Sequence, residues 1–177
     1  ILIFLYALYL SLCSAGQDFM SFQWDMLLLE TGFLAIFLGR SKLIVWLMRW
    51  LLFRLLFLSG SVQLLIHVIT WRTLNALRFL YCTQPLPTPL AWYAQQLPAT
   101  FQKLSVLLLF VIELVVPFFF FAPRRLRYIA GALTILLQVN ILLTGNYTFF
   151  NWLTIALCLR PFIYGAPHPR TSAHWGV

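Results

Sequence analysis

The chain has 177 residues, of which 62% are hydrophobic and only 9% are charged, and its formal net charge is +8. A soluble domain carries about 25% charged residues, so this composition excludes a soluble globular protein and predicts an all-α integral membrane protein that contacts the lipid bilayer. At roughly 20 residues per crossing, the chain has room for a polytopic bundle of about five to six transmembrane helices with short loops. The basic residues stand at the ends of apolar segments, which indicates membrane orientation rather than binding to nucleic acid.

In the first third of the chain, apolar segments at residues 1–15, 26–38 and 43–58 predict the first three spans. The second is short. Small residues at 59–61 predict a break after the third span, followed by an apolar stub at 62–69. The chain opens inside an apolar run without Met, so we expect a fragment or missing first residues.

The longest stretch without a span is the extramembrane or interfacial loop at 70–103. Its first part, 70–81, has the pattern of one amphipathic interfacial helix. Prolines at 85, 87 and 89 exclude a regular helix there, and a short helix is expected over 90–97.

Beyond that loop, residues 104–121 predict the clearest span, and 129–144 and 149–159 predict two more, which completes a polytopic domain over 1–159. Residues 123–128 are expected to form a basic turn, and 160–177 a disordered tail rich in Pro, Gly and His. If all six segments cross, a basic turn at 39–42, the one at 123–128 and the tail share one side, which the positive-inside rule places in the cytoplasm. The loop at 70–103 then faces outward.

Four charged residues lie inside apolar segments: Glu30, Arg49, Arg54 and Glu113. A charge at the centre of a membrane helix costs about 2.5–3.5 kcal/mol, so such residues form ion pairs that join helices or line a proton or substrate path. Arg49 and Arg54 point about 140° apart on a helix, so we expect Glu30 to pair with one arginine and Glu113 with the other. Asp25 is expected in the first turn of its helix, where an acid is favourable.

The other candidate chemistry is sparse. Cys13, Cys82 and Cys158 are far apart and have no metal-ligand spacing, so neither a disulfide framework, nor a metal site, nor a cofactor is expected. His67 has no neighbouring ligand pattern and is interpreted as structural. No catalytic motif is recognised.

Two strings are much more specific than general hydrophobicity: QWDMLLLETGF at 23–33 and TQPLPTP at 83–89. With RWLLFRLLF, KLSVLLLFVIELVVP and GNYTFFNWLT, they resemble the lipase maturation factor family in order and approximate spacing, over about residues 16–159. The resemblance implies a polytopic membrane protein. In animals the family resides in the endoplasmic reticulum and helps secreted lipases fold and assemble. Bacterial relatives are expected in the inner membrane, and GQDFMSFQWD and APRRLRYIAG look closer to those.

The chain departs from the family pattern in three places. Family members usually have a Tyr-His-Tyr-Glu string before the Thr-Gln-Pro sequence, whereas residues 80–82 here read Leu-Tyr-Cys. Gln63 stands near the place of a common lysine. Residues 160–177 do not resemble the large soluble domain that follows in the family, so a truncated or frame-shifted end is expected.

The first functional hypothesis is therefore a non-enzymatic membrane folding factor. Its partners would be secreted lipases or other membrane subunits, and the outward loop would be the client-facing surface. The candidate contacts in that loop are Trp71, Gln84, Pro85, Pro87, Trp92 and Tyr93. A second hypothesis is a membrane enzyme acting on lipid or protein side chains, in which the four charges converge on a cavity. A third is a transporter or a structural membrane subunit.

Overall fold

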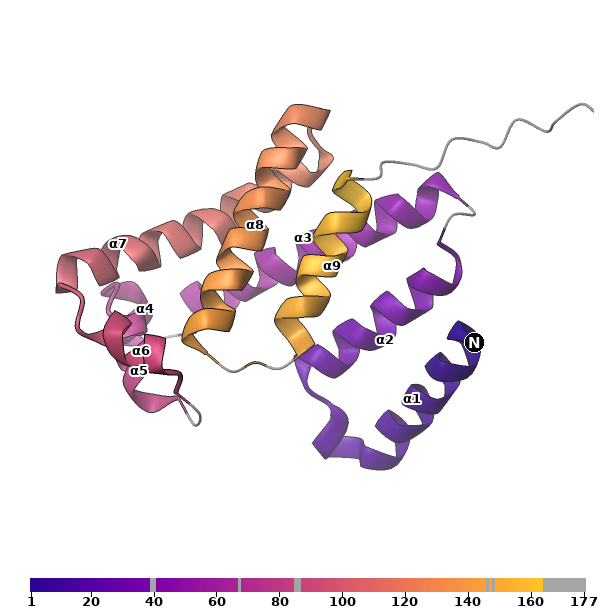
Figure 1. Cartoon of the computed structure of the whole chain (residues 1–177), viewed down its shortest axis with the longest axis horizontal. Helices are drawn as coiled ribbons and strands as arrows, with labels where there is room; N and C mark the ends of the chain where they lie inside the picture. The colour runs from indigo at the N-terminus through magenta and orange to yellow at the C-terminus, as the bar shows by residue number, and fades with distance from the viewer. Residues whose placement is uncertain (39–40, 67, 85–86, 146, 148, 164–177) are drawn as a thin grey trace, which may run out of the picture.

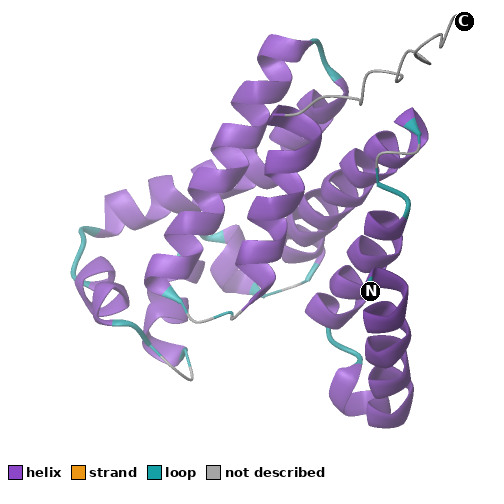
Figure 2. Ribbon diagram, turned by 45° about the vertical axis from the view of Figure 1, so that its right-hand side comes forward, coloured by secondary structure: helices purple, strands orange, loops and turns teal. Residues whose placement is uncertain are grey.

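The computed structural model describes residues 1–163 apart from 39–40, 67, 85–86, 146 and 148, and every regular element in that part is helical (Figures 1 and 2). This confirms the all-α class. The predictions made for residues 39–40 of the first basic turn, for His67 and Pro85, and for the tail beyond residue 163 concern residues that the structure does not describe.

Within the described part, four helical segments are long and apolar enough to cross a membrane. The first is α1 (Leu2–Gly16) with the 3-10 turn η1 (Gln17–Met20), and the second is α3 (Lys42–Leu65). The third joins α7 (Ala99–Phe110), the π-helical η2 (Val111–Val115) and the 3-10 segment η3 (Val116–Phe121). The fourth is α8 (Arg124–Thr144). A polytopic membrane fold is thereby confirmed.

Two further helices are shorter. The helix α2 (Gln23–Ile36) has 14 residues and α9 (Phe149–Ile163) has 15, so they extend about 21 and 22 Å against a hydrocarbon core of about 30 Å. Both pack within the bundle, α2 between α1 and α3, and α9 against α3 and α8.

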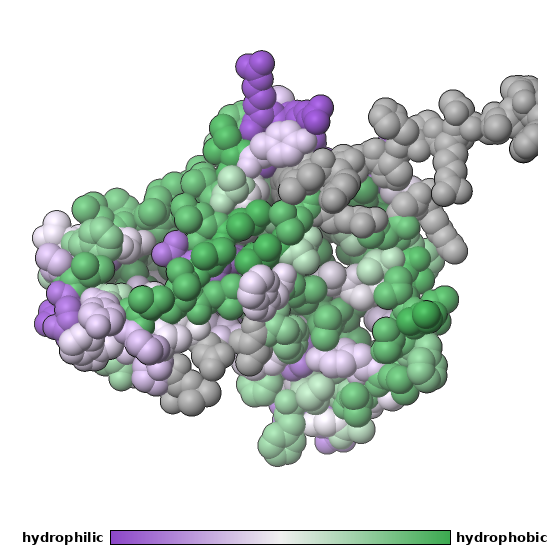
Figure 3. Space-filling view, in the orientation of Figure 1, coloured by the Kyte–Doolittle hydropathy of each residue, from purple (hydrophilic) through white to green (hydrophobic). Residues whose placement is uncertain are grey.

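The two ends of the bundle differ in character. The start of α8 and the end of α9 lie at the top of Figure 1, whereas α4–α6, the end of α8 and the start of α9 lie lower in that view. Hydrophilic residues gather at the start of α8, at the top of Figure 3, above an apolar middle. Polar ends that flank an apolar belt are what a bilayer requires of a spanning bundle.

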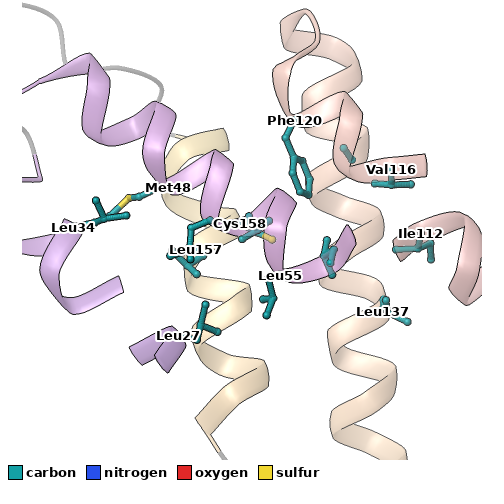
Figure 4. Close-up of a cluster of buried hydrophobic side chains, with 14 residues drawn as sticks. Leu27, Leu34, Met48, Leu55, Ile112, Val116, Phe120, Leu137, Leu157 and Cys158 are labelled. Carbon is teal, nitrogen blue, oxygen red and sulfur yellow. The ribbon is translucent and has the colours of Figure 1, made fainter. Parts of the chain in front are cut away.

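The helix α3 organises the interior. Its side chains Met48, Leu52 and Leu55 join a buried cluster to which α2, η2, η3, α8 and α9 also contribute (Figure 4). No residue of α1 is buried, so α1 lies at the edge of the bundle with its apolar side chains toward lipid.

The expected break at 59–61 is wrong, because α3 continues through it to Leu65. The Ser61 hydroxyl donates to the carbonyl of Phe57 at 2.6 Å, so the hydroxyl is satisfied without interrupting the helix. Gly60 is there for packing: a Cβ at this position would stand 2.9 Å from the Cβ of Glu113 on η2. Small residues in membrane helices allow this close approach.

The expected single helix over 70–81 is also wrong. The chain forms α4 (Ile69–Arg72) and α5 (Ala76–Thr83), separated by a turn in which Leu74 has φ 57. A non-glycine residue in this left-handed region cannot continue a right-handed helix. The next helix, α6 (Pro89–Gln95), begins with proline in its first turn, and the Thr88 hydroxyl caps it by accepting from the amide of Ala91 at 3.2 Å. The described residues between α5 and α6 are not helical, as the prolines predicted.

Three boundaries need correction as well. The basic residues of 123–128 follow Pro123 into the first turns of α8 instead of forming a turn, since proline suits the residue before or at a helix start. The third long span begins at Ala99, so residues 99–103 belong to it and not to the loop. The helix α9 continues over 160–163, which were assigned to the tail.

Candidate functional site

The clearest charged contact inside the bundle joins α2 and α3. Arg54 donates to the carboxylate of Glu30 and forms an ion pair with it, which is one of the pairings expected from sequence. The side chains of Arg54 and Glu30 are 42% and 43% exposed. Part of this exposed area faces a cavity of about 430 Å³ between α1, α2 and α3, which both side chains line.

A second polar contact links α1 to α2. The Tyr9 hydroxyl donates to Asp25 Oδ1 at 2.6 Å. Asp25 stands in the first turn of α2, as the sequence predicted, and is only 4% exposed. Tyr9 was not singled out from sequence, because a tyrosine in an apolar run is typical of an interfacial residue.

Glu113 lies in the π-helical turn η2, where it faces α3. The Ser59 hydroxyl donates to Glu113 Oε1 at 3.3 Å, and the Gln63 amide in turn lies 3.5 Å from the Ser59 oxygen. The expected pairing of Glu113 with an arginine is therefore not found in the described contacts. Arg49 stands ten residues before Ser59 on α3, which places it about 15 Å away along the axis.

Arg49 lies in the first half of α3 and does not line the cavity that Glu30 and Arg54 share. The four charges thus separate into three places. Glu30 and Arg54 share a cavity, while Glu113 and Arg49 lie elsewhere in the bundle. The convergence that a membrane enzyme would need is absent from the described contacts.

Sequence reasoning missed a buried polar set on α8 and α9, which pack along each other. Its members are Thr134, Gln138, Asn151 and Thr154, and none is more than 3% exposed. The two threonine hydroxyls donate to carbonyls four residues earlier in their own helices. Uncharged amides within apolar segments could have signalled this interface, because such side chains turn toward neighbouring helices and away from lipid.

The candidate client contacts that the sequence predicted in the loop differ in how exposed their side chains are. Trp92 and Tyr93 on α6 are 61% and 64% exposed, and their rings meet edge to face with centroids 5.1 Å apart. Pro87 is exposed and Gln84 is half-buried. Trp71 is half-buried and packs against Phe110 of α7 at 5.9 Å between ring centroids, so it anchors α4 to the bundle.

The α4–α6 unit (residues 69–95) is tied to the membrane helices by polar contacts that the sequence did not reveal. The Gln102 amide on α7 donates to the carbonyls of Ala94, Gln95 and Leu97 at 3.3, 3.0 and 3.3 Å. The Thr88 hydroxyl donates to the carbonyl of Leu143 near the end of α8 at 2.7 Å. Burial raises the pKa of Tyr81 on α5, and a hydrogen bond to Thr144 opposes that shift. The unit is therefore held in place against α7 and α8.

Apolar helices of spanning length, joined by an ion pair and by buried polar side chains, define the described part of the chain as a polytopic helical membrane domain. Over residues 1–163 it matches the family described as the lipase maturation factor transmembrane domain, and the chain belongs to that family.

Curated relatives carry the same family name. The chain is 52% identical over 164 residues to lipase maturation factor 2 of Gallus gallus, an alignment that covers 84% of this chain and 23% of the relative. Identity is 49% over 179 residues to lipase maturation factor 2 of Homo sapiens, covering 89% and 25%. It is 40% over 171 residues to lipase maturation factor 1 of Mus musculus, covering 89% and 30%. The chain thus spans between a fifth and a third of the length of these relatives. No solved structure matches it.

Proposed function

We propose that this chain acts as a membrane-embedded maturation factor that assists the folding or assembly of secreted lipases. The observation that carries the proposal is the family match over residues 1–163, with relatives named as lipase maturation factors at about half identity. The chain spans only part of those relatives, so the proposal concerns the share of the work that its membrane helices and the α4–α6 unit perform.

The α4–α6 unit is the client-facing surface in this proposal. It presents Trp92 and Tyr93 outward, together with Phe79 and Leu90, which are 56% and 48% exposed. Exposed aromatic residues on a fixed support are typical of the centres of protein interfaces. The hydrogen bonds from Gln102 and Thr88 supply that support.

Orientation follows from charge. Arg124, Arg125 and Arg127 begin α8 at the end of the bundle opposite α4–α6, and the positive-inside rule assigns that end to the cytoplasm. The α4–α6 unit then faces the compartment into which secreted proteins enter. The relatives described above are animal proteins, which favours the endoplasmic reticulum over a bacterial inner membrane.

A chimera tests the proposal. Residues 1–163 replace the corresponding part of lipase maturation factor 2 or 1 in cells that lack the endogenous protein, and the activity of secreted lipases is measured. We expect the chimera to restore activity, and Trp92→Ala with Tyr93→Ala to reduce it at equal expression. Trp152→Ala on α9 is the matched control, because Trp152 is 64% exposed but lies outside the α4–α6 unit. A chimera that folds and yields no active lipase would contradict the proposal.

The alternative hypotheses have less support. A membrane enzyme would use the buried charges together, whereas the cavity that Glu30 and Arg54 line in the described part of the chain includes neither Arg49 nor Glu113. A transporter, or an assembly role with other membrane subunits, stays a hypothesis that purification of the chain with its partners would address.

A further inference from the structure

The cavity beside the Glu30–Arg54 ion pair has no role in the folding-factor proposal, and its walls are suited to a ligand. Its volume of about 430 Å³ falls within the range of about 300–1,000 Å³ for small-molecule sites. Apart from the pair, the lining is apolar or aromatic: Tyr6 from α1, Leu29, Phe33 and Leu34 from α2, and Leu47, Trp50 and Leu51 from α3.

The ion pair lies deep in the membrane. Arg54 stands 12 residues after Lys42 and 11 before Leu65 in α3, so it is about 17 Å from either end of a helix that crosses the bilayer. Its recorded hydrogen bond uses one of the five N–H donors of a guanidinium. Because both side chains line this cavity, hydrogen bonds from an occupant would stabilise their remaining polar groups.

The charge and the size of the cavity together restrict the occupant. The pair is neutral overall, so an anionic or cationic headgroup would bring an uncompensated charge into a low-dielectric site. One turn of an α-helix, about 10 Å wide and 5.4 Å long, has a volume of roughly 420 Å³, so the cavity holds no more than one turn of a client helix.

We propose that the cavity between α1, α2 and α3 binds a neutral single-chain lipid whose hydroxylated headgroup hydrogen-bonds to Glu30 and Arg54. The acyl chain lies along the aromatic wall formed by Tyr6, Phe33 and Trp50. The lipid enters from the bilayer, because α1 stands at the edge of the bundle with no buried residue and contacts α2 there, in part through the Tyr6 and Phe33 rings at 6.0 Å.

The test uses the full chain in phospholipid nanodiscs with a photoreactive monoacylglycerol as the probe. We expect labelled peptides from α1, α2 and α3, and competition by unlabelled monoacylglycerol but not by a fatty acid anion. Leu29→Trp, which fills the cavity from α2, should reduce labelling by about tenfold, equivalent to about 1.4 kcal/mol. Met26→Trp is the matched control on the same helix, since Met26 is 48% exposed and does not line the cavity.

The headgroup assignment has its own variant. Replacing both Glu30 and Arg54 with Met keeps the site neutral and should abolish the preference for monoacylglycerol over an alkane competitor. Equal labelling of Leu29→Trp and wild-type chains would overturn the proposal, as would labelling spread evenly over the apolar surface or displacement by a transmembrane peptide alone. Circular dichroism and gel filtration verify folding. If Leu29→Trp does not fold, Leu47→Trp fills the same cavity from α3 and gives the same test.

Discussion

Replacing Arg54 with Met isolates the contribution of the ion pair between α2 and α3. Methionine retains much of the apolar stem of arginine and removes the guanidinium. Glu30 then keeps its charge in the middle of the bilayer with no cationic partner in its recorded contacts. We therefore expect the single variant to be clearly destabilised.

The magnitude follows from the cost of an unpaired charge at the centre of a membrane helix, about 2.5–3.5 kcal/mol. Removing both charges avoids that cost, since replacing a buried pair by apolar side chains is often neutral. We expect Glu30→Met with Arg54→Met to lie within about 1 kcal/mol of the wild type. The coupling free energy of the cycle should then be about 2 kcal/mol or more.

The assay is reversible unfolding in mixed micelles, with the free energy of unfolding taken from a titration with sodium dodecyl sulfate. Tryptophan fluorescence provides the signal, since the chain has seven tryptophans. Four proteins complete the cycle: the wild type, each single Met variant and the double variant. If the single-variant effects add to the double-variant effect within about 0.5 kcal/mol, the two side chains do not interact and the reasoning is refuted.

Three further predictions concern packing, the α4–α6 unit and orientation. Gly60→Val should lower the free energy of unfolding by about 1–3 kcal/mol, because its Cβ would meet Glu113 at 2.9 Å; Gly32→Val, with its nearest atom at 3.6 Å, should cost less in the same titration. Thr88→Ala should destabilise α6 by about 1 kcal/mol, which we expect to measure as amide exchange about fivefold faster in α6. Unchanged exchange would show that neither the cap of α6 nor the hydrogen bond to α8 stabilises this helix. Cys82 is exposed on α5, so we use a variant that keeps only this cysteine. An impermeant maleimide should label it in opened but not in sealed microsomes. Labelling in sealed microsomes would show that α5 faces the cytoplasm, opposite to the proposed orientation.

The sequence predicts the long helices well, because a bilayer demands continuous apolar segments and tolerates few charges within them. The ion pair between Glu30 and Arg54 could also be predicted from the sequence. Charges in apolar segments are costly, and Glu30 and Arg54 lie on consecutive helices. What the sequence could not decide was which acid meets which arginine, since that depends on how the helices slide and rotate against each other.

The wrong predictions of element boundaries concern residue types that occur both in turns and within or at the start of helices. Gly60 and its serine neighbours look like a turn by the rules of soluble proteins, yet in α3 they permit close packing with η2. The basic residues after Pro123 suit an interfacial turn and the first turn of a helix equally well, since arginine can extend to the membrane surface from either. The left-handed Leu74 carries no residue-type signal at all.

The buried polar residues on α8 and α9 were missed for a different reason. Gln138 and Asn151 are neutral, so the cost of burying a charge does not single them out in the sequence. An amide in an apolar segment is costly in lipid and therefore marks a helix interface, so the same argument applied to uncharged residues would have located this contact. The tethers of the α4–α6 unit are backbone acceptors, which no residue pattern reveals.

The central claim is that the α4–α6 unit of this membrane domain contacts secreted lipases, and site-specific photo-crosslinking tests it most directly. A photoreactive amino acid replaces Trp92 on α6 or, as the matched control, the equally exposed Trp152 on α9, in cells that secrete a lipase. We expect a lipase adduct from position 92 and none from position 152. No adduct at position 92, or equal adducts at both positions, would contradict it.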